Sequence, residues 1–188
     1  ISMACLNLPL DICFKAENMY IAGIIPGPEE LHKTELNHYF RPLIDDLVVS
    51  YMTGVQFTKT ANSAVGRLSR SAVVTSVNDL PAARKASQLG WYTSHFYCTV
   101  CSAFHLSTLG NTDYHNWRSK DKNILRTQAL AWRDALTLEA RKHVWDTYAV
   151  RWSELWRFPY WDPSKQLVVD PMHCLYEGLV HKHVRHLL

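Results

Sequence analysis

The chain has 188 residues, 47% of them hydrophobic and seven of them tryptophan, and its formal net charge is +3. This length fits one domain, and the apolar content excludes a disordered chain. No run reaches the roughly 18 consecutive apolar residues of a membrane helix, and residues 1–11 lack the basic start of a signal peptide. The mildly basic charge permits nucleic-acid binding but does not by itself indicate it.

The five cysteines are an odd number and do not form a disulfide framework, which favours a reducing compartment. The chain starts with Ile1 instead of Met, and its last helical pattern runs to Leu188 without a stop signal. We therefore expect it to be an internal piece of a longer protein.

The first half predicts both strands and a helix. Residues 18–25 form a short apolar run that is typical of a buried strand. Apolar residues at helical spacing predict a helix over 36–51, with Thr34 as a possible N-cap and Pro42 as a kink. A short strand is expected over 55–58.

The elements expected after residue 66 are mostly helices. We expect, in chain order, a strand over 67–77, a helix from Leu80, helices over 125–136 and 140–148 separated at Thr137, a brief strand over 166–169 and a last helix from Asp170-Pro171 onward. This order indicates an α/β core over 1–100, a helical insertion over 101–165 and a strand and helix over 166–188 that return to the core, all in one domain.

Asp79 follows a predicted strand and precedes a helix that starts with Leu80-Pro81. A carboxylate at a strand end can project into a crevice and bind Mg²⁺. An aspartate before Pro in a first turn is also an ordinary N-cap. Both interpretations stay open from the residues alone.

Asp170 and His173 repeat this ambiguity at the start of the last helix. Residues three apart share a face of the first turn, so the two side chains are expected to reach one metal ion or one hydrogen-bonded network. The alternatives are a helix cap for Asp170 and a histidine at the edge of an apolar stripe for His173.

Cys98 and Cys101 have the spacing of zinc ligands, but a tetrahedral site needs two more. The chain offers these candidates for the remaining positions: His95, His105, His173, Cys174, His181, His183 and His186. The alternative is a pair of small, half-buried thiols. Basic residues that can contact phosphates are scattered along the chain: Lys33, Arg41, Arg67, Arg70, Arg84, Lys85, Arg118, Lys120 and Lys122.

Several blocks together resemble CACTA-type (En/Spm-like) transposases, in the version found in basidiomycete fungi. They occur in the family's order: Glu17–Pro28, Phe40–Leu47, Asp79–Lys85, Cys98-x-x-Cys101, Trp152–Leu155, Pro159–Pro163 and Asp170-x-x-His173. The resemblance covers nearly the whole chain, and separate blocks in order are more specific than any one motif.

The resemblance implies a partial RNase H-like core, a mixed sheet with flanking helices and a helical insertion, that carries a DDE triad. By position, Asp79 matches the second catalytic aspartate and binds Mg²⁺ or Mn²⁺. Asp170 and His173 match an Asp-x-x-His motif, and Cys98 and Cys101 match a pair that binds structural Zn²⁺ with histidines, for which His173 and His183 are candidates. Implied partners are DNA, as transposon ends and target, and further copies of the protein; the implied location is the nucleus.

The chain departs from the family at both ends of the triad. No Asp-Gly motif, which carries the first aspartate, occurs in it, and the final glutamate is expected beyond Leu188. We therefore expect a transposase fragment that is inactive alone. The alternatives are a non-catalytic, zinc-stabilised nucleic-acid-binding remnant and a structural or interaction domain.

Overall fold

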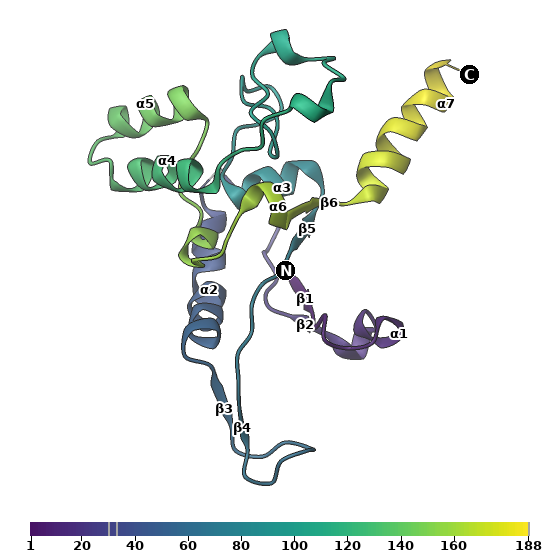
Figure 1. Cartoon of the computed structure of the whole chain (residues 1–188), viewed down its shortest axis with the longest axis vertical. Helices are drawn as coiled ribbons and strands as arrows, with labels where there is room; N and C mark the ends of the chain where they lie inside the picture. The colour runs from purple at the N-terminus through teal and green to yellow at the C-terminus, as the bar shows by residue number, and fades with distance from the viewer. Residues whose placement is uncertain (30, 33, 188) are drawn as a thin grey trace.

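A computed structural model describes residues 1–29, 31–32 and 34–187. The expectations for Lys33 and Leu188 therefore lie outside the described residues. Figure 1 shows a central body with extensions on several sides: a β-hairpin points away at the bottom, and the C-terminal helix extends to the upper right.

The described strands pair two by two and build three small sheets. The pairs are β1 (Ser2–Ala4) with β2 (Met19–Ile21), antiparallel; β3 (Val55–Phe57) with β4 (Arg67–Ser69), antiparallel; and β5 (Ser76–Asn78) with β6 (Leu167–Val169), parallel. The fold is thus mixed α/β, and the expected RNase H-like core stays a prediction.

Helices supply most of the remaining regular structure. They are α1 (Leu10–Cys13), α2 (Leu36–Met52), α3 (Leu80–Ser87), α4 (Lys122–Asp134), α5 (Leu138–Tyr148), α6 (Pro163–Gln166), the π-helix η5 (Met172–Val180) and α7 (His181–Leu187). Short 3₁₀ turns are η1 (Ala16–Asn18), η2 (Leu106–Thr108), η3 (Tyr114–Asn116) and η4 (Glu154–Arg157). Among the described residues, none of the helices combines the length and apolarity needed to cross a membrane.

The hydrophobic core joins parts of the chain that the sequence assigned to a core and an insertion. Ile44 of α2 packs in one cluster with Ala129 of α4 and with Trp156, Phe158 and Trp161. Trp156, Phe158 and Trp161 are at most 1% exposed, and each buried aromatic of this kind contributes about 2–3 kcal/mol. The tryptophan-rich segment 152–161 is therefore the centre of the described fold.

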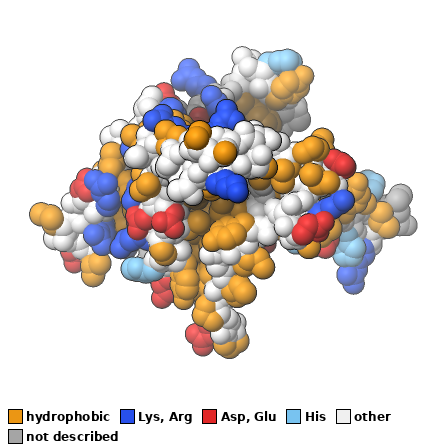
Figure 2. Space-filling model, turned by 90° about the horizontal axis from the view of Figure 1, so that it is seen from below, with side chains coloured by type: hydrophobic (Ala, Val, Ile, Leu, Met, Phe, Trp, Pro, Cys, Tyr) orange, Lys and Arg blue, Asp and Glu red, His pale blue; other side chains and the backbone are white. Residues whose placement is uncertain are grey.

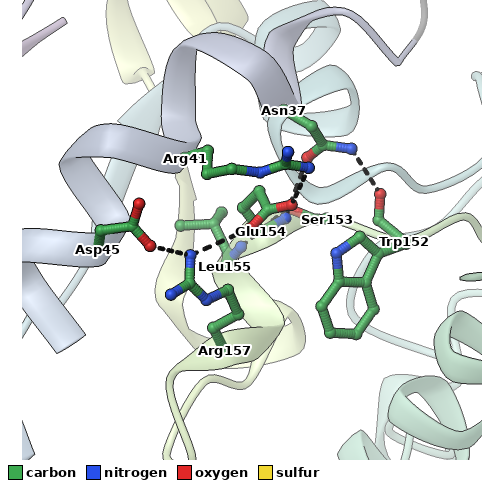
Figure 3. Close-up of polar contacts among 8 residues, drawn as sticks. All are labelled: Asn37, Arg41, Asp45, Trp152, Ser153, Glu154, Leu155 and Arg157. Atoms are coloured by element: carbon green, nitrogen blue, oxygen red, sulfur yellow. Dashed lines mark hydrogen bonds and ion pairs between the residues drawn. The ribbon is translucent and has the colours of Figure 1, made fainter.

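A buried polar network fixes α2 against η4 (Figure 3). The side chain of Asn37 donates to the Trp152 carbonyl oxygen at 2.9 Å and accepts from the Glu154 backbone N–H at 3.0 Å. The Glu154 carboxylate, almost fully buried, pairs with Arg41 at 3.2 Å and with Arg157 at 3.4 Å. This network sets the position of the helix that precedes the hairpin.

Three sequence expectations are wrong in detail. The apolar run 18–25 is not a buried strand: β2 covers three residues, and Tyr20 and Ile21 are more than 60% exposed. The expected strand 67–77 is two strands, because β4 pairs with β3 and β5 pairs with β6. The N-cap of α2 is Glu35 instead of Thr34, and it makes no side-chain capping bond.

The helix boundary expected at Thr137 is confirmed. Thr137 caps α5, with its hydroxyl accepting from the Ala140 N–H at 3.1 Å. Pro42 lies inside α2, which continues beyond it to Met52, and the expected kink stays a prediction. These features depend on short-range geometry, which the sequence specifies directly.

Candidate active site

The parallel pair β5–β6 brings two distant aspartates to the same edge. Asn78 and Val169 are register partners at the ends of the strands, and the Asp170 N–H donates to the Asn78 carbonyl oxygen at 2.7 Å. Asp79 and Asp170 are the next residues along each strand. Both therefore lie at the carboxyl edge of this sheet, where ligands bind in α/β sheets.

Gln166 stabilises the other end of the β5–β6 strand pair. Its side-chain N–H group donates to the carbonyl oxygens of Val73 and Val74 at 3.2 Å each, and its backbone carbonyl accepts from the Thr75 hydroxyl at 3.0 Å. Strands of three residues supply few ladder hydrogen bonds, so these contacts stabilise the pairing and thereby position Asp79 and Asp170. The sequence analysis did not single out Gln166, because nothing local shows its partners.

Asp79 caps α3, as one of its two interpretations predicted. Its Oδ1 accepts from the Ala82 N–H at 2.6 Å, and Pro81 occupies the first turn. The cap uses one carboxylate oxygen; within the described residues, Oδ2 takes part in no hydrogen bond. Capping and metal binding are thus compatible in this geometry.

Asp170 caps the next helix and contacts His173. Its Oδ1 accepts from the Met172 N–H at 2.9 Å, and its Oδ2 lies 2.8 Å from His173 Nδ1. The hydrogen-bonded pair expected from the spacing is present. The Met172 N–H and the His173 ring lower the pKa of Asp170.

The aspartates that follow β5 and β6 both affect the charge of His173. Its hydrogen bond to Asp170 raises the pKa of His173, and the nearby carboxylates of Glu177 and Asp79 raise it further. Glu177 Oε2 lies 3.9 Å from His173 Nε2. Asp79, Asp170 and His173 therefore share one electrostatic environment.

Cys98 lies at a turn that directs backbone N–H groups at its sulfur. Its Sγ accepts from the N–H groups of Val100 at 3.4 Å and Cys101 at 3.2 Å. Burial disfavours the Cys98 thiolate, but these backbone hydrogen bonds, a side-chain hydrogen bond with Cys101 and the charge of Lys120 together outweigh it, so the pKa of Cys98 is lowered. Burial raises the pKa of Cys101. The turn thus favours a thiolate, the form of cysteine that binds metals.

Arg84 supports the loop that carries Cys98 and is unavailable as the expected phosphate contact. It is only 5% exposed, and its guanidinium donates to the carbonyl oxygens of Gly90, at 2.6 Å, and Tyr97. Burial lowers the pKa of Arg84. Its role is to hold the loop against α3.

A pocket of about 430 Å³ opens beside the cysteine pair. Its walls are Tyr97, Cys98, Cys101, Ser102, Ala103, Thr108, Leu109, Gly110, Asn111, Asn116, Trp117 and Arg118. All five cysteines are free, so Cys98 and Cys101 are available as ligands.

The proposed zinc ligands are not assembled in the described part of the chain. There, no group of three or more His, Cys, Asp or Glu side chains lies close enough to hold a metal ion. His173 pairs with Asp170, and His183 lies exposed on α7. The rings of His95 and His105, two other candidates, lie 4.9 Å apart. Zinc and magnesium binding therefore stay predictions.

Comparison with known proteins gives one family. The sequence profile of Transposase family tnp2 matches residues 1–121, a region that includes Asp79 and the cysteine pair but not Asp170 or His173. No curated protein matches the chain, and no solved structure matches it. The matched region is more than half of the 188 residues, so the chain belongs to Transposase family tnp2.

Proposed function

We propose that this chain is the middle of the catalytic core of a cut-and-paste DNA transposase of the CACTA type, with an RNase H-like fold. The intact protein would hydrolyse phosphodiester bonds and transfer strands. Membership of a transposase family makes the function transposase-related. The observation that supports the finer proposal is the parallel β5–β6 edge, which carries Asp79 and Asp170 on adjacent strands.

In this proposal Asp79 is a ligand of Mg²⁺ or Mn²⁺. The helix cap uses Oδ1, so Oδ2 is the hard oxygen donor that these ions prefer. When bound, two such ions would activate the attacking oxygen and stabilise the leaving one. Asp79 would orient the ion while its Oδ1 keeps α3 in place.

Asp170 and His173 would support this site. Metal-binding histidines commonly hydrogen-bond a carboxylate through their other ring nitrogen. The Asp170 contact is made by His173 Nδ1, so Nε2, which lies 3.9 Å from Glu177 Oε2, is the nitrogen that would face a ligand. The proposal includes DNA ends and target DNA as partners, self-association and a nuclear location.

The isolated chain is expected to be inactive, because it supplies one of the three DDE carboxylates. The test is DNA cleavage by the full-length protein encoded by the transcript, with Mg²⁺ and a transposon-end duplex. Asp79→Asn keeps a good N-cap residue and removes the carboxylate, so cleavage should be lost while the fold is retained. Asp121→Asn, at the cap of α4, is the matched control.

The result that contradicts the proposal is cleavage that Asp79→Asn leaves intact. Mg²⁺-dependent nicking by the isolated chain that disappears in Asp79→Asn would contradict the expected inactivity of the fragment. In that case the described residues alone would hold a working site.

The turn at Cys98 favours a second candidate, a non-catalytic, zinc-stabilised nucleic-acid-binding module. Amide groups that donate to a sulfur stabilise its metal-binding thiolate form. This candidate predicts salt-dependent DNA affinity that survives Asp79→Asn and is lost on chelation of zinc. Absence of DNA binding at low salt would instead favour a structural or interaction domain.

A further inference from the structure

The β3–β4 hairpin is a two-stranded ribbon that extends from the end of α2 and is uncovered on both faces (Figure 1). All six residues of its strands are exposed, including Phe57 at 48% and Leu68 at 54%. An isolated two-stranded hairpin buries too little surface to be stable by itself. The hairpin therefore presents two free faces to a partner.

Its backbone is nonetheless well specified. Gly66 has φ +79°, and a Cβ there would lie 2.0 Å from the Phe57 carbonyl oxygen, so only glycine fits. The tip closes through reciprocal backbone hydrogen bonds between Thr60 and Ser63 at 2.9 and 3.2 Å. At the base, the Ser50 and Ser71 hydroxyls lie 2.6 Å apart. The ribbon is thus an extension with a defined backbone conformation.

The charge of the ribbon is of one sign. Residues 47–78 contain no Asp or Glu, although the whole chain has 17. They contain three cations, Lys59, Arg67 and Arg70, all exposed. Arg67 lies directly across from Phe57 on one face, and Arg70 follows β4. Nothing on the ribbon neutralises these charges, so it favours a polyanion.

We infer that the hairpin inserts as a β-ribbon into a groove of duplex DNA, with Lys59, Arg67 and Arg70 on phosphates. The DNA major groove admits a two-stranded ribbon, and Arg, Lys, Ser and Thr are the usual phosphate contacts. The exposed strand residues Gln56 and Ser69 add hydrogen-bonding groups on opposite faces. The inference rests on the proposed function, which makes DNA the partner.

The rest of the surface seen from this side is less uniform. Figure 2, viewed from below, shows positive, negative and hydrophobic side chains intermixed. The hairpin precedes the start of β5, whereas Asp79 and Asp170 follow the ends of β5 and β6. Figure 1 shows the hairpin away from β5 and β6, so we expect changes in the hairpin to leave the candidate active site intact, and the two proposals can be tested separately.

The test compares DNA affinity of the chain and its variants by fluorescence anisotropy with a mixed-sequence duplex over a range of salt concentrations. The hairpin variant is Lys59→Gln, Arg67→Gln and Arg70→Gln. The charge-matched control replaces three exposed lysines elsewhere: Lys15→Gln, Lys142→Gln and Lys182→Gln. A third variant, Arg67→Lys with Arg70→Lys, keeps the charges.

The salt slope is the decrease of log affinity with log salt concentration, and each lost phosphate contact lowers it by about 0.9. Loss of three contacts should therefore make the change in Kd between about 50 and 200 mM salt roughly 40-fold smaller. The control and the Lys variant should keep the slope of the unmodified chain. Equal melting temperatures of all variants establish that folding is unchanged, which is expected because the three substituted side chains are exposed.

Two results would overturn the inference. If the unmodified chain binds DNA and the hairpin variant keeps its slope, the hairpin is not the contact, and the proposed function stands. If the unmodified chain binds no DNA at low salt, DNA contact by these residues is wrong altogether. Dimers in sedimentation that Phe57→Ala dissociates, with DNA affinity unchanged, would make the hairpin a protein interface and likewise overturn it.

Discussion

The N–H of Asp170 donates to the carbonyl oxygen of Asn78 across 2.7 Å, and this bond places the ends of β5 and β6 together. Asp79 and Asp170 are 91 residues apart in the sequence, yet they become neighbours at one sheet edge. The family match covers Asp79 but stops before Asp170. The parallel pairing is therefore what connects the matched region to the Asp-x-x-His motif.

Two substitutions at Asp79 should show how much the cap of α3 contributes to the free energy of unfolding. Asp79→Ala removes the cap of α3 and should lower the free energy of unfolding by about 1 kcal/mol. Asp79→Asn keeps a capping oxygen and should change stability by only a few tenths of a kcal/mol. Urea unfolding measures both. Equal losses in the two variants would contradict the capping role.

The pair of Asp170 and His173 predicts a specific pH dependence. Because the pKa of His173 is raised, its contribution to stability is complete below its usual value of 6.5 and is lost as pH rises through the folded value. Because the pKa of Asp170 is lowered, its contribution is complete above its usual 3.8 and is lost as pH falls further. The pair therefore stabilises the fold most between these two values.

The measurement is an NMR titration of the His173 ring. In Asp170→Asn its pKa should fall toward the usual value, whereas Glu177→Gln should lower it less, since Glu177 lies 3.9 Å away. His143→Ala, at an exposed position of α5, is a control that should leave the His173 titration unchanged. A His173 titration that is identical in Asp170→Asn and the unmodified chain would exclude the ion pair.

Features that depend on a few neighbouring residues were predictable from the sequence. The caps at Asp79 and Thr137 follow from an acceptor side chain placed two or three residues before free N–H groups. The contact between Asp170 and His173 follows from helical spacing alone. Such geometry needs no knowledge of the tertiary fold.

Features that depend on distant partners were not predictable. The sequence alone predicts Arg84 on the surface, because the Gly90 and Tyr97 carbonyl oxygens that accept its hydrogen bonds approach it only in the folded chain. The apolar run 18–25 reads as buried, but no described element covers β2 enough to shield Tyr20 and Ile21. The pairing of β5 with β6 likewise crosses some 90 residues and has no local signal.

Asn37 should be important for stability, because its side chain is the buried link between α2 and the segment 152–154. Asn37→Ala leaves the Trp152 carbonyl and the Glu154 N–H buried without their partner, at a cost of roughly 2–4 kcal/mol. Asn116→Ala removes an exposed hydrogen bond to Asp113 and should cost less than about 0.5 kcal/mol. Thermal unfolding compares the two; similar losses would show that the Asn37 network contributes little.

Zinc binding should depend on Cys98 and Cys101 and not on the exposed cysteines. Cobalt(II), a spectroscopic substitute for zinc, should give thiolate absorption with the unmodified chain that disappears in Cys98→Ser and in Cys101→Ser. Cys5→Ser, at an exposed free cysteine, should retain it. The zinc assignment fails if the unmodified chain shows no thiolate absorption, or if Cys5→Ser loses it equally.

The hairpin should be sensitive to a side chain at Gly66 and insensitive to one at Gly110. Both glycines have φ near +80°, but a Cβ at Gly66 would lie 2.0 Å from the Phe57 carbonyl oxygen, whereas one at Gly110 meets nothing within 4 Å. Gly66→Ala should therefore open the β3–β4 pairing and speed amide exchange there, with little change in the melting temperature of the core. Gly110→Ala carries only the backbone strain of about 1 kcal/mol. Slow exchange of the hairpin amides in Gly66→Ala would show that the close approach at Phe57 does not constrain the ribbon.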